Sequence, residues 1–184
     1  GANASRRRGA DPHIRILLPI VTDPNEVINL DSILNDLMIE FDEIADIGAM
    51  IECPRACFVA RELTEVCQFI CFNSDTLHES TFGMCQDDAE CSFLNKYEDL
   101  RILSNNPFVA IDQKGVGQLM KTFVNEAKEV KSDTIICITG NNFFDMNSVD
   151  FCYRIGIDTI TCKPLMAPVA RLCAAQAIIQ KENS

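Results

Sequence analysis

Cysteine and histidine are the side chains that bind transition metals most readily, and this chain has ten cysteines and two histidines. Three cysteine pairs are close in sequence, two with three intervening residues and one with five: Cys53 and Cys57, Cys67 and Cys71, and Cys85 and Cys91. None has the C-x-x-C spacing of a zinc knuckle. Most cysteines lie in apolar runs such as VCQFICF and TIICITG, which is typical of small buried residues in a reducing compartment. We therefore expect neither a zinc site nor an essential disulfide.

The elements that must position any reactive group follow from the apolar pattern. Short runs that are apolar throughout predict strands, at Ile14–Ile20, Gly48–Glu52, Phe69–Phe72, Ile135–Ile138 and Thr159–Cys162. Stretches with apolar residues at helical spacing predict helices at 26–39, 55–65, 116–130, 148–155 and 168–180. The long polar segment 73–113 is assigned no element. Continuous apolar strands that alternate with helices indicate an α/β fold with a parallel sheet covered by outer helices.

Ligands of such folds bind at the carboxyl ends of the strands. The residues there are 19–23, 52–55, 73–76, 139–142 and 163–164. Any functional site is therefore expected among these five segments.

Several longer stretches form a recognisable series. They are ILLPIV, GAMIECPRA (48–56), TFGMCQDDA (81–89), NPFVAIDQKGVGQLMK (106–121), SVDFCYRIGID (148–158) and PVARLCAAQA (168–177). Together they resemble the C-terminal phosphoenolpyruvate/pyruvate-binding barrel of the pyruvate phosphate dikinase family. They follow the family's order over about residues 12–180, without large gaps.

The family's barrel has eight strands, and this chain resembles only the last five. The resemblance therefore implies a partial (β/α)8 barrel at 13–180, between a flexible or truncated segment 1–12 and a tail 181–184. The family's first three strands carry two arginines for the substrate phosphate, and its other domains bind the nucleotide and carry a phosphohistidine; none of these is matched. Either the chain is a piece of a larger protein, or it is a reduced half-barrel whose open sheet edge is covered by a protein partner in a larger complex.

In the family, two carboxylates from consecutive strand ends bind a divalent metal. Glu52 matches the first. The second lies in a GTNDL motif, against which Asn73, Ser74, Asp75 and Thr76 align, so Thr76 replaces the metal-binding aspartate and Asp75 its asparagine neighbour. The resemblance implies a remnant substrate site of these five residues, with Glu52 and Asp75 as weak remnant metal ligands. A one-residue slip that restores Asp75 as a ligand, and a helix-capping role for Glu52, remain alternatives.

The family's general acid is a cysteine, and Thr139 occupies its position. An alcohol does not exchange protons at neutral pH as a thiol does, so we expect no catalytic residue here. Cys137 lies one layer deeper on the same strand and is not expected to substitute for the missing cysteine. Arg154 and Arg171 are interpreted as helix-surface or salt-bridge residues rather than phosphate ligands.

Composition excludes other function classes. The net charge is −11, and the only basic run is Arg6, Arg7 and Arg8, so the chain is not expected to bind nucleic acid. It has no apolar stretch long enough to insert into a membrane. Its cysteine usage suits an intracellular, reducing compartment, without separating cytosol, mitochondrion and plastid.

Three functions are compatible with the resemblance. The positions of the general acid and of one metal ligand differ from the family, while the scaffold stretches remain similar. This contrast favours a catalytically degenerate half-barrel that acts as a structural or interaction subunit, with no cofactor. The first alternative is a fragment or divergent form of an active dikinase, which would need magnesium and interconvert pyruvate and phosphoenolpyruvate. The second is a module that binds either compound without turnover.

Overall fold

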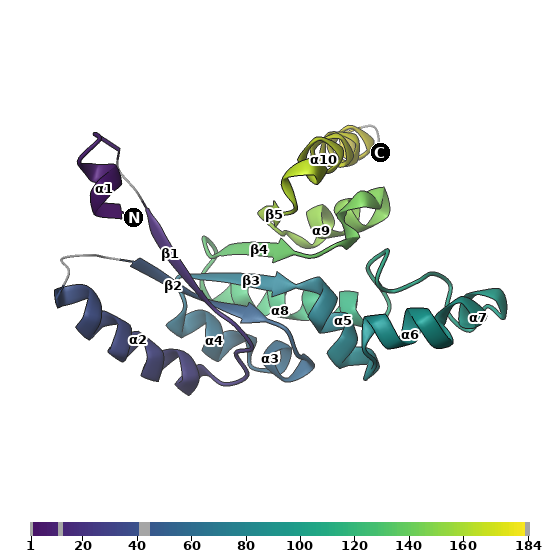
Figure 1. Cartoon of the computed structure of the whole chain (residues 1–184), viewed down its shortest axis with the longest axis horizontal. Helices are drawn as coiled ribbons and strands as arrows, with labels where there is room; N and C mark the ends of the chain where they lie inside the picture. The colour runs from purple at the N-terminus through teal and green to yellow at the C-terminus, as the bar shows by residue number, and fades with distance from the viewer. Residues whose placement is uncertain (1, 11–12, 41–44, 183–184) are drawn as a thin grey trace.

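The computed structural model describes residues 2–10, 13–40 and 45–182, in which five parallel strands form one sheet (Figure 1). The strands lie in sequence order, β1 (Ile14–Leu18), β2 (Ala45–Ile51), β3 (Phe69–Asn73), β4 (Ile135–Thr139) and β5 (Thr159–Thr161). Each pairs only with its neighbours in the chain, so β1 and β5 are the two edges of the described sheet. The predicted α/β class, with five parallel strands and outer helices, is confirmed.

Helices connect the strands. They are α1 (Ala2–Arg6), α2 (Pro24–Glu40), α3 (Pro54–Phe58), α4 (Ala60–Val66), α5 (Ser74–Phe82), α6 (Gln86–Ser92), α7 (Leu94–Asp99), α8 (Val116–Val130), α9 (Met146–Ile155) and α10 (Ala167–Glu182), with short 3-10 turns at Asn142–Phe144 and Pro164–Met166. In Figure 1, α2, α3, α4 and α8 lie along one face of the sheet, while α5 to α7 extend from the carboxyl end of β3. α10 packs against α9 beyond β5. No helix in the described ranges is long and apolar enough to cross a membrane.

The main core lies between the sheet and these helices. Alternate strand residues point into it, which is why Ile70 and Phe72 of β3 and Ile136 and Ile138 of β4 are fully buried. From the helix side, α8 buries an apolar stripe, and the ring of its Phe123 meets that of Phe72 edge-on with centroids 5.2 Å apart.

The opposite face of the sheet has its own packing. Gly48 lies in register with Phe69 on β3, and a Cβ on Gly48 would lie 2.6 Å from the Phe69 ring. The guanidinium of Arg15 lies over the same ring, 5.6 Å from its centroid. The next row toward the carboxyl ends joins Cys71 to Cys137, its Cα partner on β4. Cys137 therefore lies two residues before Thr139, one layer deeper, as expected.

Several boundaries differ from those predicted. β1 ends at Leu18 rather than at Ile20, because Pro19 has no N–H to donate and Ile20 has a φ of 53°. The single helix expected at 55–65 is two helices, since the backbone of Val59 between them is not helical (φ −116°, ψ 33°).

The segment 73–113, to which no element was assigned, holds three short helices. α6 and α7 enclose a small second core of Ala89, Leu94 and Phe108. Helices this short have few apolar residues, so their periodicity does not stand out from a polar background.

His78 joins this segment to the rest of the domain. It is fully buried on α5, where its Nδ1 lies 2.6 Å from the carbonyl oxygen of Ser74 and its Nε2 lies 3.0 Å from the backbone nitrogen of Asp112. Because the Asp112 N–H donates to Nε2, the imidazole is neutral with its proton on Nδ1. Burial lowers the pKa of His78, and this is partly opposed by the Ser74 carbonyl and by the charges of Asp112 and Asp75.

This arrangement predicts that His78 makes folding stability depend on pH. The lowered pKa of the folded state means that the unfolded chain binds a proton first, so His78 weakens folding as the pH falls below about 6.5. The free energy of unfolding of the wild type should therefore drop more between pH 7.5 and pH 5.5 than that of His78→Gln, which has no titrating group there. Urea titrations at the two pH values measure the difference, with His13→Gln as the control for an exposed histidine. An equal drop in all three proteins would contradict the prediction.

Candidate functional site

The expected site residues form one row across the carboxyl ends of the central strands. Asn73 of β3 is the Cα partner of Thr139 of β4, which in turn pairs with Thr161 of β5. Glu52 directly follows Ile51, the last residue of β2, whose partner is Phe72. The register therefore places Glu52 beside Asn73, so the structure brings the predicted residues of three strands to one edge of the sheet.

Glu52 connects the ends of three strands. Its side chain is 7% exposed, and its Oε2 accepts a hydrogen bond from the backbone N–H of Ile20 at 2.7 Å. Its Oε1 accepts one from Nδ2 of Asn73 at 2.8 Å. The N-cap residue of α3 is Cys53, which makes no side-chain cap hydrogen bond, and the two oxygens of Glu52 accept from Ile20 and Asn73, outside this helix. The carboxylate thus neither caps the helix nor is free of protein donors.

Ile20 adopts an unfavourable backbone conformation in making this hydrogen bond, with a φ of 53°. A positive φ is rare for a β-branched residue, and here it turns the N–H of Ile20 toward Glu52 while the side chain stays 65% exposed. Sequence reasoning did not find this role of Ile20, because a backbone donor leaves no mark on residue type.

Asn73 and Ser74 have structural roles at the start of α5. The side chain of Asn73 accepts from the backbone N–H of Thr76, which makes it the N-cap of the helix. The hydroxyl of Ser74 is fully buried and lies 2.7 Å from Oδ1 of Asn142 and 3.1 Å from the carbonyl oxygen of Thr139. These residues fix the loop after β3 against the loop after β4.

Asp75 is paired with Asn141 rather than with Glu52. Its Oδ1 accepts from the Asn141 backbone N–H at 3.0 Å, and its Oδ2 accepts from the Asn141 side-chain amide at 2.8 Å. Thr76, at the family's aspartate position, is half-buried. The structure therefore gives the carboxylate of Asp75 a partner that the sequence interpretation did not foresee.

Gly140 allows this close approach of the two loops. Its φ is +151°, and a Cβ built on it would lie 1.8 Å from Oγ of Ser74. Only glycine fits without moving Ser74. The same contact is what brings Asn141 within reach of Asp75.

A cavity of about 250 Å³ lies between the ends of β3, β4 and β5. It is lined by Asn73, Asp75, Thr139, Gly140, Asn141, Cys162 and Lys163. The cavity has one carboxylate and one ammonium group, and Glu52 does not line it. Thr139, the only hydroxyl in this lining, is a much weaker acid than a thiol, and the one thiol of the lining is that of Cys162, which follows β5.

The two carboxylates that the resemblance implies as magnesium ligands both have protein partners in this structure. Both oxygens of Glu52 and both of Asp75 accept hydrogen bonds from protein groups, and Asp75 lines the cavity whereas Glu52 does not. Within the described ranges, no three histidine, cysteine or carboxylate side chains come together as a metal-binding group.

Two cysteines of the central strand region, Cys67 and Cys71, are poor nucleophiles. Burial raises the pKa of the Cys71 thiol to about 12 and that of Cys67 to about 11, so both are neutral at physiological pH. Their burial confirms the interpretation of these residues as small hydrophobes.

Sequence comparison matches the chain to a known family. Residues 2–179 match the family described as "PEP-utilising enzyme, PEP-binding domain". Among curated proteins, pyruvate, phosphate dikinase of Entamoeba histolytica is 33% identical over 96% of this chain, and that of Giardia intestinalis is 34% identical over 97%. The chloroplastic enzyme of Flaveria bidentis is 35% identical over 89%. The chain covers 21%, 21% and 18% of these proteins, so it spans about a fifth of their length.

Solved structures with a similar fold are more distant in sequence. Pyruvate kinase of Cryptosporidium parvum superposes with a TM-score of 0.59 at 12% identity, covering 96% of this chain and 34% of that one. A citrate lyase of Burkholderia xenovorans LB400 gives 0.60 at 10% identity, covering 87% and 48%. At such identities the likeness concerns the fold alone.

Gly140→Ala tests whether the loop contact at Ser74 holds the site together. We expect it to lower the free energy of unfolding by at least about 2 kcal/mol, because the new methyl group displaces Ser74 and the backbone is strained. Gly83→Ala is the matched control, since Gly83 also has a positive φ (+64°) but has no atom within 4 Å of the point where a Cβ would lie. Chemical denaturation of both variants measures the difference. Equal losses would mean that backbone strain alone, without the Ser74 contact, explains the effect.

Proposed function

The chain belongs to the family of PEP-binding domains of PEP-utilising enzymes, with pyruvate, phosphate dikinases among its relatives, and we propose that it is a catalytically degenerate member. In this proposal the half-barrel is a structural or interaction subunit of a larger assembly, whose other parts cover its open sheet. The observation that supports it most directly is the hydrogen bonding of the two remnant ligands: Glu52 is held by Ile20 and Asn73, and Asp75 by Asn141.

The substitutions at the family's reactive positions support the same proposal. Thr139 stands at the position of the family's general-acid cysteine, and its hydroxyl is too weak an acid to donate a proton at neutral pH. Thr76 stands at the position of the metal-binding aspartate and lacks the negative charge that would attract a divalent cation. The scaffold stretches around them remain similar to the family. Loss confined to reactive positions is what selection for structure without catalysis would leave.

A second candidate is that the chain is a fragment or divergent form of an active dikinase. It is favoured by identities of 33–35% with pyruvate, phosphate dikinases over most of the chain and by the retained Glu52. Under this candidate, magnesium and the substrate would displace the hydrogen bonds that now engage the two carboxylates. The two candidates differ in whether this chain binds magnesium at Glu52.

Calorimetric titration with magnesium and oxalate, an enolate mimic, distinguishes them. We expect no binding heat from the wild type at millimolar magnesium, because its carboxylates already have protein donors. Thr76→Asp should increase magnesium binding, since it adds an anionic oxygen at the family's ligand position, while Thr76→Asn, of similar size but neutral, should not. Wild-type binding that disappears in Glu52→Gln, with the variant's fold verified by circular dichroism, would overturn the proposal of degeneracy.

The proposed subunit role also predicts that the isolated chain associates. β1 is an edge strand that carries Leu17, a half-buried residue in register with Gly48 on the face away from the helices. Without a partner, such an edge pairs with other copies or aggregates. Light scattering should therefore show oligomers or poor solubility. Leu17→Lys should raise the monomer fraction because a charged edge disfavours pairing, and Leu17→Ile should not. A wild-type monomer with a cooperative thermal transition would contradict the prediction.

A further inference from the structure

Three sulfur-containing residues lie in one row across the sheet. Met50 of β2 is the Cα partner of Cys71 of β3, and Cys71 is in turn the Cα partner of Cys137 of β4. Residues that are partners on neighbouring parallel strands point to the same face, so these three side chains lie side by side. The sheet therefore gathers sulfur atoms from three strands that are far apart in the sequence.

This sulfur row lies on the face of the sheet away from α2, α3, α4 and α8. Ile70 and Ile136, the residues just before the two cysteines, are buried in the main core, and side chains alternate along a strand. Cys71 is buried, whereas Met50 and Cys137 are half-buried. The row is thus shielded at Cys71 and accessible at its two other members in the described structure.

The two thiols are close enough to affect each other's ionisation. The pKa of the Cys71 thiol is raised to about 12, mainly by burial and next by the neighbouring Cys137. Burial also raises the pKa of Cys137, opposed by a hydrogen bond with the side chain of Thr159 and by the positive charge of Arg15. Two thiolates at this distance repel each other, so a cation between them would stabilise both.

The spacing of the two strands suits a bridging metal ion better than a disulfide. Partners on neighbouring strands are about 4.8 Å apart. A bond from a thiolate sulfur to a d10 metal ion is about 2.3 Å, as for zinc, so two thiolates on opposite sides of one ion are about 4.6 Å apart. A disulfide needs Cβ atoms within about 3.5–4.5 Å, which would require β3 and β4 to move together. The pair is therefore spaced for a linearly coordinated ion.

The softness and the number of these ligands select the metal. Thiolates and thioethers prefer soft ions such as Cu(I). Zinc takes four protein ligands in its structural sites, and in the described part of the chain no three histidine, cysteine or carboxylate side chains come together to supply them. Cu(I), a d10 ion, accepts two or three sulfur ligands. Cu(I) is therefore the ion that fits the sulfur row best.

We propose that Cys71 and Cys137 bind one Cu(I) ion as two thiolates, with the thioether of Met50 as a weaker third ligand. A metal ion deprotonates the thiols that it binds. Two Cu–S bonds to thiolates form and two S–H bonds break, both protons pass to solvent, and copper remains Cu(I), so no oxidant or reductant is consumed. The site is independent of whether the half-barrel is catalytically degenerate.

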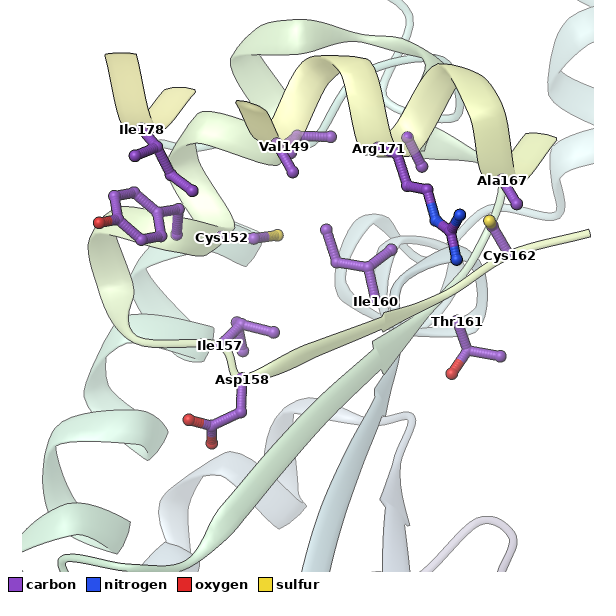
Figure 2. A pocket seen from close by; sticks show the side chains of 13 residues that line it. Val149, Cys152, Ile157, Asp158, Ile160, Thr161, Cys162, Ala167, Arg171 and Ile178 are labelled. Atoms are coloured by element: carbon purple, nitrogen blue, oxygen red, sulfur yellow. The ribbon is translucent and has the colours of Figure 1, made fainter. Parts of the chain in front are cut away.

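Cys162 provides a matched control for Cys137. Both are half-buried. Cys162 follows β5 and lines a cavity of about 550 Å³ between β5, α9 and α10 (Figure 2). Cys152 of α9 lines the same cavity, but in Figure 2 the side chain of Ile160 lies between the two cysteines. We therefore do not expect Cys162 to share an ion with Cys152.

Cu(I) binding to the 184-residue chain tests the proposal, measured without oxygen in competition with the chelator bicinchoninate. Cys137→Ser should weaken the tightest site by at least about a hundredfold, because one of two thiolates is lost. Cys162→Ser should leave the affinity unchanged. Met50→Leu, of similar size, should weaken binding less than Cys137→Ser, since a neutral thioether binds a cation less strongly than a thiolate. Circular dichroism verifies the fold of each variant.

Two measurements on the wild type need no variant. X-ray absorption at the copper edge, with one equivalent of Cu(I), should show sulfur ligands only. The same equivalent should slow the alkylation of Cys137, while the exposed Cys85 and Cys91 react at unchanged rates.

Three outcomes would overturn the proposal. The first is a Cys137→Ser variant that binds Cu(I) as tightly as the wild type, and the second is an equal loss of affinity in Cys162→Ser or Met50→Leu. The third is a Cys71–Cys137 disulfide after mild oxidation without protection of Cys137 by Cu(I), which would indicate a redox pair. Magnesium, a hard ion, does not compete for thiolates, so the calorimetric test of catalytic degeneracy has a separate outcome.

Discussion

The carboxylate of Glu52 is the contact on which the geometry of the site depends. It receives the backbone N–H of Ile20 after β1 and the side-chain amide of Asn73 at the end of β3, while its own backbone carbonyl accepts the hydroxyl of Ser80. Hydrogen bonds to a charged acceptor in a buried place are among the stronger ones, about 1.5–3 kcal/mol each. Three strand ends and α5 are thereby held together at the carboxyl edge of the sheet. A carboxylate, which can coordinate a cation, can equally accept hydrogen bonds from protein donors.

The neighbouring loops are held by a second, neutral set of contacts. Ser74 reaches the loop after β4 only because Gly140 has no side chain, and this approach places Asn141 against Asp75. The carboxylates of Glu52 and Asp75 thus have different partners, Glu52 bonding toward β1 and β3 and Asp75 toward the loop after β4. Each carboxylate bonds to the donors nearest to it, and these hydrogen bonds connect the loops at the carboxyl edge of the sheet.

Much of the fold could be predicted from the sequence, because apolar runs and helical spacing are strong signals. The strand at Phe69–Phe72 and the helix at 116–130 were located almost to the residue, since both are buried on a continuous face. The short helices α6 and α7 were missed because they pack on a small satellite core and have little periodicity of their own, and α5 was missed because it contributes only Leu77 and Phe82 to the main core. The residues at the carboxyl edge were located from the family pattern. Their hydrogen bonds could not be predicted, because Ile20 donates to Glu52 through its backbone N–H and because Asn141 lies 66 positions from its partner Asp75 in the sequence.

The order of the strands in the sheet also bears on how the domain is made. Every strand pairs with the one before it in the chain, so each new strand and its helix find their docking surface already synthesised. A closed barrel must instead wait for its last strand to meet its first, a contact of the highest sequence separation. The five described strands can therefore form unit by unit, each on the strand before it. The last described strand, β5, has only three residues and one neighbour in the described sheet, so few backbone hydrogen bonds oppose its local opening.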